Sequence, residues 1–289
     1  MKLKDRNLYY VGGVVRDELL GFDSLDTDYC YQGDAIKFAL DNFGENVIKT
    51  NPDFGTVRVI YEGNEIDIAS TREESYPKKG HLPKVINIGC PLEKDLKRRD
   101  FTINAMAKNT LTNELFDPYN GKGDLADKKL RVLHDQSFVD DPTRIIRGLK
   151  FSVRFGFELD SHTQKLQNDY LKNINYDMSY HRIKKELVET FNLNKGEAFD
   201  KFVEQGIYKL LGENQAVPKI KGKSIENAVK KNTFIPWIIY MGFFDLSGLP
   251  LTRAEKKIIE WDERLKMQEY TNNTPMESIV LHNLEGKIC

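Results

Sequence analysis

Two short segments near the N-terminus combine a turn that could bind a ligand with a pair of acids. Gly12 and Gly13 follow the apolar, strand-like stretch Leu8–Val11, and a helical pattern follows them. Since glycine has no side chain, backbone N–H groups of this turn can approach a ligand closely, and the start of the next helix favours an anion. Asp26 and Asp28 are two residues apart, so on a strand both carboxylates would point to one face, where a divalent metal relieves their repulsion. This combination indicates phosphoryl or nucleotidyl transfer.

Each of these features has an ordinary explanation when it is taken alone. A Gly-Gly pair is usually only a turn, and Asp-x-Asp is usually a solvated strand edge or loop. Residues 12–21, Gly-Gly-x-Val-Arg-Asp-x-Leu-Leu-Gly, followed by Asp26-x-Asp28, resemble the opening motif of class II tRNA nucleotidyltransferases and bacterial poly(A) polymerases, in the DNA polymerase β-like superfamily. The resemblance implies that Asp26 and Asp28 hold two Mg²⁺ ions. It also implies that Gly12, Gly13 and Arg16 bind the nucleotide.

A third carboxylate is a candidate for the same site. Asp67 lies in a predicted strand, residues 65–69, with Ile66 and Ile68 pointing the other way. Beside Asp26 and Asp28 it would complete a two-metal site. Spacing alone leaves an ordinary exposed strand aspartate equally open, and the resemblance favours a catalytic role.

The second motif is residues 98–105, Arg-Arg-Asp-Phe-Thr-Ile-Asn-Ala. Adjacent arginines are common on surfaces, but this pair leads directly into an apolar segment, which should draw one of them inward. Arginine suits phosphate because its guanidinium presents a planar fork of donors. The segment resembles the second motif of the same family. The resemblance implies that Arg99 contacts the bound nucleotide, and that Asp100 and Asn104 help to hold its sugar.

The third motif is residues 140–147, Asp-Asp-Pro-Thr-Arg-Ile-Ile-Arg, where Asp141, Arg144 and Arg147 would share one helix face. From the residues alone, a helix cap formed by an aspartate before a first-turn proline is the favoured explanation. The segment resembles the family's base-reading motif, although Lys150 stands where a further arginine is common. A carboxylate accepts and an arginine donates, so the pair fits the amine and ring nitrogen of cytosine or adenine and repels uracil and guanine.

Two later segments are less specific. Residues 179–187 weakly resemble the family's last motif, and an amphipathic helix with a charged face is the simpler explanation. Residues 217–232 carry five lysines against one acid, which fits either a solvated face or contact with a phosphate backbone. These residues are Lys219, Lys221, Lys223, Lys230 and Lys231, with Glu226 as the acid.

The elements that must position these residues change in character along the chain. Strand and helix patterns alternate to about residue 110, including a helix over 34–43 capped by Asp34 and strands 56–61 and 65–69 joined at Gly63-Asn64. Residues 70–90 contain two prolines and no periodicity, which predicts a long mobile loop. From Asp140 onward apolar residues recur at helical spacing.

These patterns predict an α+β fold, with a mixed α/β head built on a nucleotidyltransferase-type sheet and an all-α neck and body. The expected domains are a catalytic head over 1–135, a helical neck carrying the base-reading helix over 136–195, and a helical body with a short tail over 196–289, which would contact tRNA. The resemblance covers about residues 8–190, and the residues beyond 200 resemble no family that we recognise.

Composition excludes several classes of protein. The 43 basic and 44 acidic residues nearly balance, which does not indicate a nucleic-acid binder, and 40% hydrophobic content fits a soluble globular protein. No apolar run is long enough to cross a bilayer, and the first residues lack the apolar core of a signal peptide. Three widely spaced cysteines without a Cys-x-x-Cys pattern favour reduced thiols and a cytoplasmic location.

The resemblance implies a CCA-adding tRNA nucleotidyltransferase that acts on the tRNA 3′ end with CTP, ATP and Mg²⁺, away from membranes, and leaves the oligomeric state open. Alternatives within the family are an A-adding enzyme, a CC-adding enzyme and a poly(A) polymerase. Residues 72–83 argue against CC-adding relatives, whose corresponding loop is shortened, and basic extensions typical of the polymerases are missing. Two alternatives lie outside this family. The first is a non-catalytic tRNA-binding protein, which the intact acid pair disfavours. The second is a small-molecule nucleotidyltransferase, which would not need the helical body.

Overall fold

The computed structural model of the chain describes residues 3–23, 27–232, 235–266 and 275–285, so Asp26 lies outside the described residues. The chain forms two compact units. The first consists of residues 1–137 with 158–163, and the second of residues 138–157 with 164–289. The mixed sheet of the first unit and the helices of the second confirm the predicted α+β class. The finer division into head, neck and body stays a prediction.

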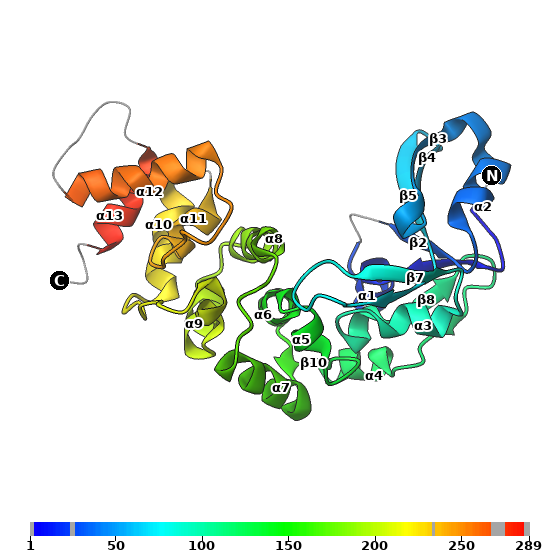
Figure 1. Ribbon diagram of the computed structural model, residues 1–289, viewed down its shortest axis with the longest axis horizontal. Coiled ribbons are helices and arrows are strands. Elements are labelled where there is room, and N and C mark those ends of the chain that lie inside the picture. The colour runs from blue at the N-terminus through cyan, green and yellow to red at the C-terminus, as the bar shows by residue number, and fades with distance from the viewer. Residues whose placement is uncertain (1–2, 24–26, 233–234, 267–274, 286–289) are drawn as a thin grey trace. The chain divides into compact units, whose positions relative to one another are not determined.

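The first unit contains all the strands of the described chain and several short helices (Figure 1). Its strands are β1 Leu8–Val11, β2 Asp28–Tyr31, β3 Val47–Asn51, β4 Thr56–Tyr61, β5 Asn64–Ser70, β6 Arg72–Ser75, β7 Lys84–Ile88, β8 Ala107–Asn109, β9 Leu115–Phe116, β10 Lys129–Leu130 and β11 Glu158–Leu159. Its helices are α1 Gly13–Leu19, α2 Ala35–Phe43, α3 Leu92–Lys97 and α4 Gly121–Ala126, with 3₁₀ turns η1 Gly44–Asn46, η2 Pro52–Phe54 and η3 Thr102–Asn104.

Seven strands form the main sheet in the order β3-β4-β5-β2-β1-β8-β9. The β2–β5 pair is parallel, and every other adjacent pair is antiparallel. The single parallel pair sets Asp28 directly opposite Asp67 in the register. The sheet therefore brings together two segments that are far apart in the sequence.

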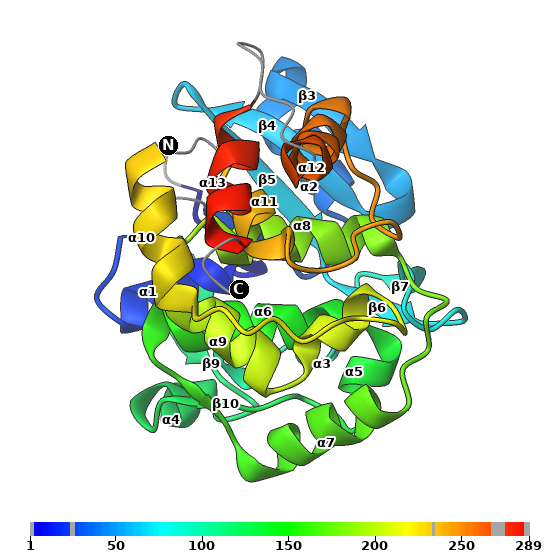
Figure 2. The same ribbon diagram turned by 90° about the vertical axis from the view of Figure 1, so that its left-hand side faces the viewer.

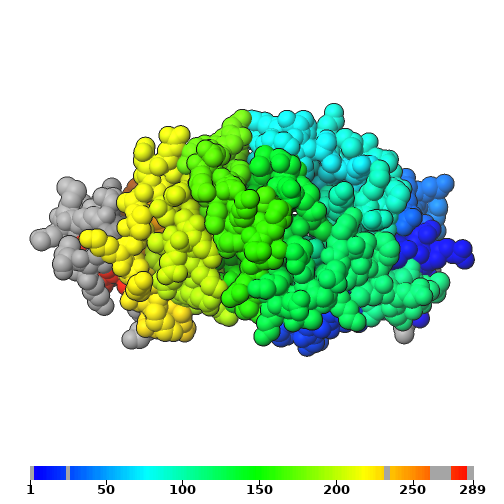
Figure 3. Space-filling model, turned by 90° about the horizontal axis from the view of Figure 1, so that it is seen from below, coloured from blue at the N-terminus to red at the C-terminus, as the bar shows by residue number. Residues whose placement is uncertain are grey.

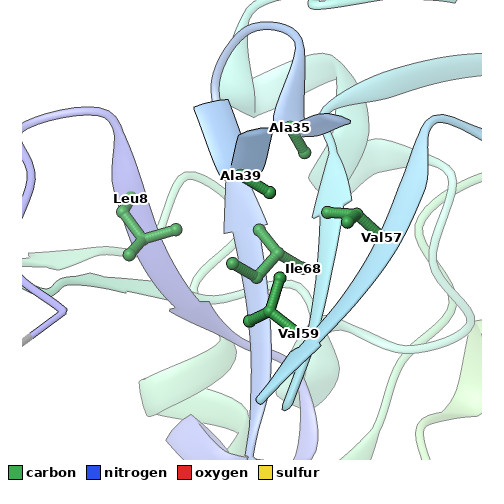
Figure 4. Packing of buried hydrophobic residues seen from close by; sticks show 6 residues of the cluster. All are labelled: Leu8, Ala35, Ala39, Val57, Val59 and Ile68. Atoms are coloured by element: carbon green, nitrogen blue, oxygen red, sulfur yellow. The ribbon is translucent and has the colours of Figure 1, made fainter. Parts of the chain in front are cut away.

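The core of this sheet follows the alternation of side chains along β4. Val57 and Val59 are buried while Arg58 between them is exposed, as expected of a strand with one covered face. Ala35 and Ala39 lie one turn apart on α2 and pack onto the same cluster, together with Leu8 and Ile68 (Figure 4). The predicted cap is confirmed, since the Asp34 carboxylate accepts a hydrogen bond from the Lys37 N–H at 3.0 Å.

Two local expectations for this unit are wrong. Asn64 belongs to β5 and pairs with Tyr61, so the tight turn consists of Glu62 and Gly63, both with positive φ. Residues 70–90 are not a structureless loop but an antiparallel hairpin of β6 and β7. Its strands show no alternation because they form a separate two-stranded sheet.

The hairpin is exposed along much of its length. Its residues include Leu82, Ile86 and Ile88, whose apolar side chains are largely accessible. The cyan atoms of this part of the chain lie at the surface in Figure 3. The hairpin is held by the packing of β6 beside α3 and of β7 beside η2. Figure 2 shows β6 and β7 side by side.

The regular elements that the structure describes in the second unit are all helices. Its elements are α5 Ser137–Asp140, α6 Thr143–Phe155, α7 Ser161–Lys172, α8 Tyr180–Phe191, α9 Gly196–Glu204, η4 Ile207–Leu211, α10 Gly222–Asn232, α11 Pro236–Met241, α12 Arg253–Lys266 and α13 Met276–Glu285, where α5 and α7 begin at residues of the first unit. The predicted helical character from Asp140 onward is confirmed, apart from β11, which pairs with β10 in the first unit.

Two glycines allow α9 and α10 to touch at their N-termini. A Cβ on Gly222 would lie 1.9 Å from the Gly196 carbonyl oxygen, so no larger residue fits without a shift of the backbone. Each helix supplies an acid to the other: Glu226 accepts from the Gly196 N–H at 2.9 Å, and Asp200 accepts from the Gly222 N–H at 2.8 Å. Glu226 also pairs with Lys223 and Lys230, two lysines of the basic segment.

Replacing Glu226 by Gln should destabilise the protein in a pH-dependent way. Hydrogen bonds from Lys230, the Gly196 N–H and Lys223 lower the pKa of Glu226 from 4.5 to about 2. The stabilisation is therefore complete above pH 4.5 and is lost as the pH falls towards 2. We expect E226Q to unfold about 2–4 °C below the parent at pH 7, as for the loss of a cap. Thermal unfolding followed by circular dichroism should show the two curves converging below pH 4.5.

The matched control is E204Q, because Glu204 is an exposed acid at the end of α9. E204Q should unfold with the parent at every pH. A constant difference between E226Q and the parent from pH 7 to pH 3 would contradict the proposed role of the ionised carboxylate.

None of the described helices combines the length and the hydropathy needed to cross a membrane. Cys30 and Cys90 are both buried and free, and burial raises the pKa of each thiol.

Candidate active site

The glycine turn lies against the arginine of the second motif. Gly12 has φ of 70°, a conformation that glycine adopts without strain, and α1 begins at the next residue. A Cβ on Gly12 would lie 2.8 Å from Nη1 of Arg99. The absence of a side chain at Gly12 therefore lets the guanidinium of Arg99 approach the turn.

Arg16, Asp100 and Asn104 are joined in a buried hydrogen-bonded chain. Nη1 of Arg16 donates to Oδ1 of Asn104 at 2.7 Å, and Nδ2 of Asn104 donates to Oδ1 of Asp100 at 2.9 Å. Nε of Arg16 also donates to Asp17 at 2.8 Å. The structure thus brings the first two motifs together, and this network fixes the glycine turn relative to residues 98–105. Contact of these three side chains with a nucleotide stays a prediction.

The carboxylates lie on adjacent strands of the main sheet. Asp28, at the first residue of β2, and Asp67, on β5, are register partners in a parallel pair, so their side chains leave the same face. Asp67 is held by Arg58, whose Nε and Nη2 donate to its two oxygens at 2.7 and 2.8 Å. Of the pair Asp26 and Asp28, the structure describes only Asp28.

A cavity of about 390 Å³ joins these groups within the first unit. Two acids, Asp28 and Asp67, line the cavity together with the two arginines of the second motif, Arg98 and Arg99. A space with carboxylates and guanidiniums on its walls can accept a metal-bound polyphosphate. The cavity is further lined by Val11, Tyr29, Cys30, Lys49, Thr50, Asn51, Thr56, Val57, Arg58, Ile68, Ala69 and Arg72.

The donor set suits a hard divalent cation. Asp28 and Asp67 offer carboxylate oxygens on one face, which is the ligand chemistry that Mg²⁺ prefers. Among the described residues no group of three acids, histidines or cysteines forms a complete metal site. The assignment of the ion to Asp26 and Asp28 stays a prediction, because Asp26 lies outside the described residues.

Asp95 is a residue of this site that the sequence analysis did not single out. Its side chain is fully buried, and it accepts hydrogen bonds from both Arg98 and Arg99. Burial alone would raise the pKa of Asp95, but Arg99 and Arg98 outweigh this and hold the pKa below its usual value. The signal was available in the sequence, since an acid three and four residues before two arginines marks helical ion pairs.

The base-reading candidates lie in the second unit, where Asp141 serves two interactions at once. Its Oδ1 accepts from the N–H of Thr143, the first residue of α6, at 3.2 Å and from the Thr143 hydroxyl at 2.6 Å, while Pro142 occupies the N-cap position. Its Oδ2 pairs with Arg182 and lies 4.0 Å from Nε of Arg144. Asp141 precedes α6, which begins at Thr143, so the expectation that it lies within the helix is wrong. Asp141 is therefore not the N-cap residue that the helix-cap explanation predicts, and its base-reading role stays a prediction.

Helix α8 supplies partners that the sequence analysis missed. Glu186 accepts from Arg147 at 3.2 Å and from Lys150 at 2.8 Å, while Arg182 reaches Asp141. Residues 179–187 are therefore an amphipathic helix whose charged face holds α6 residues in place. Arg144 is only 4% exposed, so its orientation is set by the protein.

The comparisons with known proteins agree with these motifs. Residues 8–131 match the poly(A) polymerase head domain. An A-adding tRNA nucleotidyltransferase of Aquifex aeolicus is 42% identical over 163 residues, 55% of this chain and 20% of the relative. A CCA-adding enzyme of Staphylococcus saprophyticus is 30% identical over 263 residues, 87% of this chain and 63% of that enzyme.

A solved structure of a CCA-adding enzyme in an apo form matches with a TM-score of 0.80 at 26% identity, covering 96% of this chain and 75% of that one. The chain spans only 20% of the length of the Aquifex relative. Residues 8–131 thus belong to the poly(A) polymerase head-domain family, and over most of its length the chain is similar in sequence and in fold to tRNA nucleotidyltransferases.

Proposed function

We propose that this protein is a tRNA nucleotidyltransferase that adds or repairs the 3′-terminal CCA with CTP and ATP and releases pyrophosphate. The observation that carries the proposal is the cavity that Asp28, Asp67 and Arg99 line beside the glycine turn. Nucleotidyl transfer needs a carboxylate site for metal and cationic donors for a triphosphate in one place. The named relatives support tRNA as the acceptor.

In the proposed reaction the carboxylates of Asp26 and Asp28 would hold two Mg²⁺ ions. Magnesium, when bound, lowers the pKa of the attacking 3′-hydroxyl and neutralises the leaving pyrophosphate. Asp67 faces the same side as Asp28 and is oriented by Arg58. Asp67 is thus the third carboxylate at the cavity wall, and its position there is fixed by Arg58.

Arg99 is the candidate donor to the phosphates. Its Nε is buried and lacks a hydrogen-bond partner among the described residues, so the side chain retains an unused donor. A buried donor without a partner is costly, and an anionic ligand would satisfy it. The buried hydrogen-bonded network of Arg16, Asp100 and Asn104 then holds the segment of Arg99 in place beside the glycine turn.

Base selection would come from the second unit. Asp141 accepts and Arg144 donates, which complements the amine and ring nitrogen of cytosine and adenine. Uracil and guanine present a carbonyl and an N–H instead, so both contacts become repulsive. Because Thr143 and Arg182 fix Asp141, the pair is oriented before a nucleotide arrives, and Arg147 supports it from the next turn.

A second candidate is addition of the terminal A alone. It is favoured by the identity to the Aquifex A-adding enzyme, 42% against 30% for the Staphylococcus CCA-adding enzyme, although the former alignment covers less of the chain. Addition of one A is the same nucleotidyl transfer and needs the same kind of metal-binding carboxylates and phosphate donors, so the geometry of the site fits both candidates.

The test uses two tRNA transcripts, one ending before CCA and one ending in CC. Each is incubated with Mg²⁺ and CTP, ATP or both, and the product ends are sequenced. Addition of C, C and A to the first transcript supports the main proposal. Extension of only the second transcript, by one A, establishes the alternative, and extension of neither contradicts both.

Shortening the hairpin should impair A addition. One binding site must accept the larger adenine after cytosine, and the base-reading side chains are held by their ion pairs, so we propose that the hairpin tip adjusts the site. Replacing residues 77–83 by a short Gly-Ser link leaves β6 and β7 intact. We expect C addition to persist, and A addition to a tRNA ending in CC to fall about tenfold or more, as for loss of a gating segment. An unchanged rate of A addition would remove any switching role from the hairpin tip.

A further inference from the structure

Five charged side chains form a buried cluster at the base of the hairpin. The charged cluster consists of Arg72, Glu74, Asp95, Arg98 and Arg99, all in the first unit. The Asp95 side chain is 0% exposed and that of Glu74 only 3%, while the three arginines are largely buried. Buried charges are retained only when they are paired, so each contact in this cluster has a large effect on its neighbours.

Asp95 divides its two oxygens between the hairpin and the nucleotide-binding candidate. Its Oδ1 accepts from the backbone N–H of Arg72 at 3.1 Å and from Nε and Nη2 of Arg98 at 3.0 and 2.8 Å. Its Oδ2 accepts from Nη2 of Arg99 at 3.1 Å. The first residue of β6 and the proposed phosphate donor are therefore bonded to one carboxylate.

Glu74 completes the link on the hairpin side. Its Oε1 accepts from Nε of Arg72 at 2.7 Å and from Nη1 of Arg98 at 3.2 Å. Arg98 thus bridges the two acids, with one acid on β6 and the other on α3. A shift of Arg98 towards either acid must alter its bond to the other.

The cluster carries one more positive than negative charge, because three arginines face two carboxylates. Arg72, Arg98 and Arg99 all line the cavity, and Nε of Arg99 is the buried donor without a partner in the described chain. An anion entering this cavity would attract Arg99 and weaken its bond to Asp95. The bonds from Arg98 to Asp95 would then strengthen, and the bond from Arg98 to Glu74 would weaken.

We infer that Asp95 is a positioning residue that couples phosphate occupancy of the cavity to the β6–β7 hairpin. Occupancy redistributes the bonds of Arg98 and Arg99 and so changes how firmly the base of the hairpin is held. The identification of the anion as a nucleotide triphosphate rests on the proposed function. The coupling itself requires only a polyphosphate in the cavity.

Limited digestion with trypsin tests this coupling without any turnover. Lys78 and Lys79 are exposed at the hairpin tip, so cleavage there reports the state of the hairpin, and cleavage after the exposed Lys128 serves as internal reference. Inorganic tripolyphosphate is the probe, and its binding is measured by calorimetry. In the parent we expect tripolyphosphate to change the rate of cleavage at the tip relative to Lys128 by about fivefold, the lower end of typical coupling between sites.

Asp95→Asn should still bind tripolyphosphate but lose the change in cleavage, because an amide cannot be shared equally among cationic donors. Glu74→Gln is the second variant, which keeps Asp95 and should weaken the change even if Asp95→Asn fails to fold. Asp41→Asn is the matched control, since Asp41 is an exposed acid on α2 outside the cluster, and it should behave as the parent.

Several results would overturn the inference. They are a parent that does not bind tripolyphosphate, a parent that binds it with unchanged cleavage, and full coupling retained in Asp95→Asn or in Glu74→Gln. The outcome is separate from the tRNA assay: coupling through Asp95 without tRNA extension would leave this inference standing and reject the proposed function. Extension of tRNA without coupling would reject this inference and leave the proposed function standing.

Discussion

Asp28→Ala is expected to abolish nucleotidyl transfer while the protein remains folded. Asp28 is exposed at the start of β2 and does not belong to the apolar core of the sheet, whereas the cavity loses one of its carboxylates when Asp28 is removed. Loss of a metal ligand removes several kcal/mol of transition-state stabilisation, which corresponds to about a thousandfold or more in rate. The measurement is single-turnover extension of a tRNA ending in CC with ATP and Mg²⁺, together with a thermal unfolding curve.

Asp41→Ala provides the control, because it removes another exposed acid of the same unit that does not line the cavity. It should extend tRNA at the parent rate. If Asp28→Ala also retained near-parental turnover with Mg²⁺, the assignment of the metal site to this edge of the sheet would be wrong.

Arg144→Ala is expected to relax the choice of base. The side chain is buried beside Asp141 and supplies the donor that penalises an N–H on the ring edge of uracil or guanine. Removing a charge-assisted hydrogen bond should reduce the preference for CTP over UTP, or for ATP over GTP, by about tenfold or more. The preference is measured as the ratio of kcat/KM values for the paired nucleotides.

Loss of a buried arginine will also lower stability, so a control must separate the two effects. Arg154→Ala removes an exposed arginine from the same helix, and it should leave both discrimination and stability near those of the parent. If the Arg144→Ala protein is less stable but selects CTP and ATP as well as the parent does, the role of Arg144 is limited to the packing of α6.

Local chemistry explains which parts of the fold could be predicted from the sequence. The Asp34 cap, the alternation of Val57 and Val59, and the glycine turn at Gly12 each depend on residues within a few positions of one another. Such signals are complete in a short window of sequence, so the elements they predict were confirmed.

The hairpin at residues 72–88 shows why other parts could not be predicted in this way. Its first strand is rich in charge, and charged residues without periodicity indicate a loop. Glu74 is nevertheless buried, because Arg98 reaches it from a segment 24 positions away. Arg72 pairs with Glu74 from two positions away, but the second partner, Arg98, is distant in the sequence, so a short window around residue 74 contains only part of the reason for its burial.

The sequence by itself determined the chemistry available to this protein: an acid pair after a glycine turn, an arginine motif for phosphate, and an acid–arginine pair suited to a base. The tertiary structure alone decided which of these groups meet. The parallel pairing of β2 with β5 places Asp28 opposite Asp67, and a contact spanning 88 positions joins Arg16 to Asn104. Arg182 likewise reaches Asp141 from 41 positions away. Strand register and helix packing are set by the burial of apolar faces along the whole chain, and the polar groups of the candidate site take their positions from that packing.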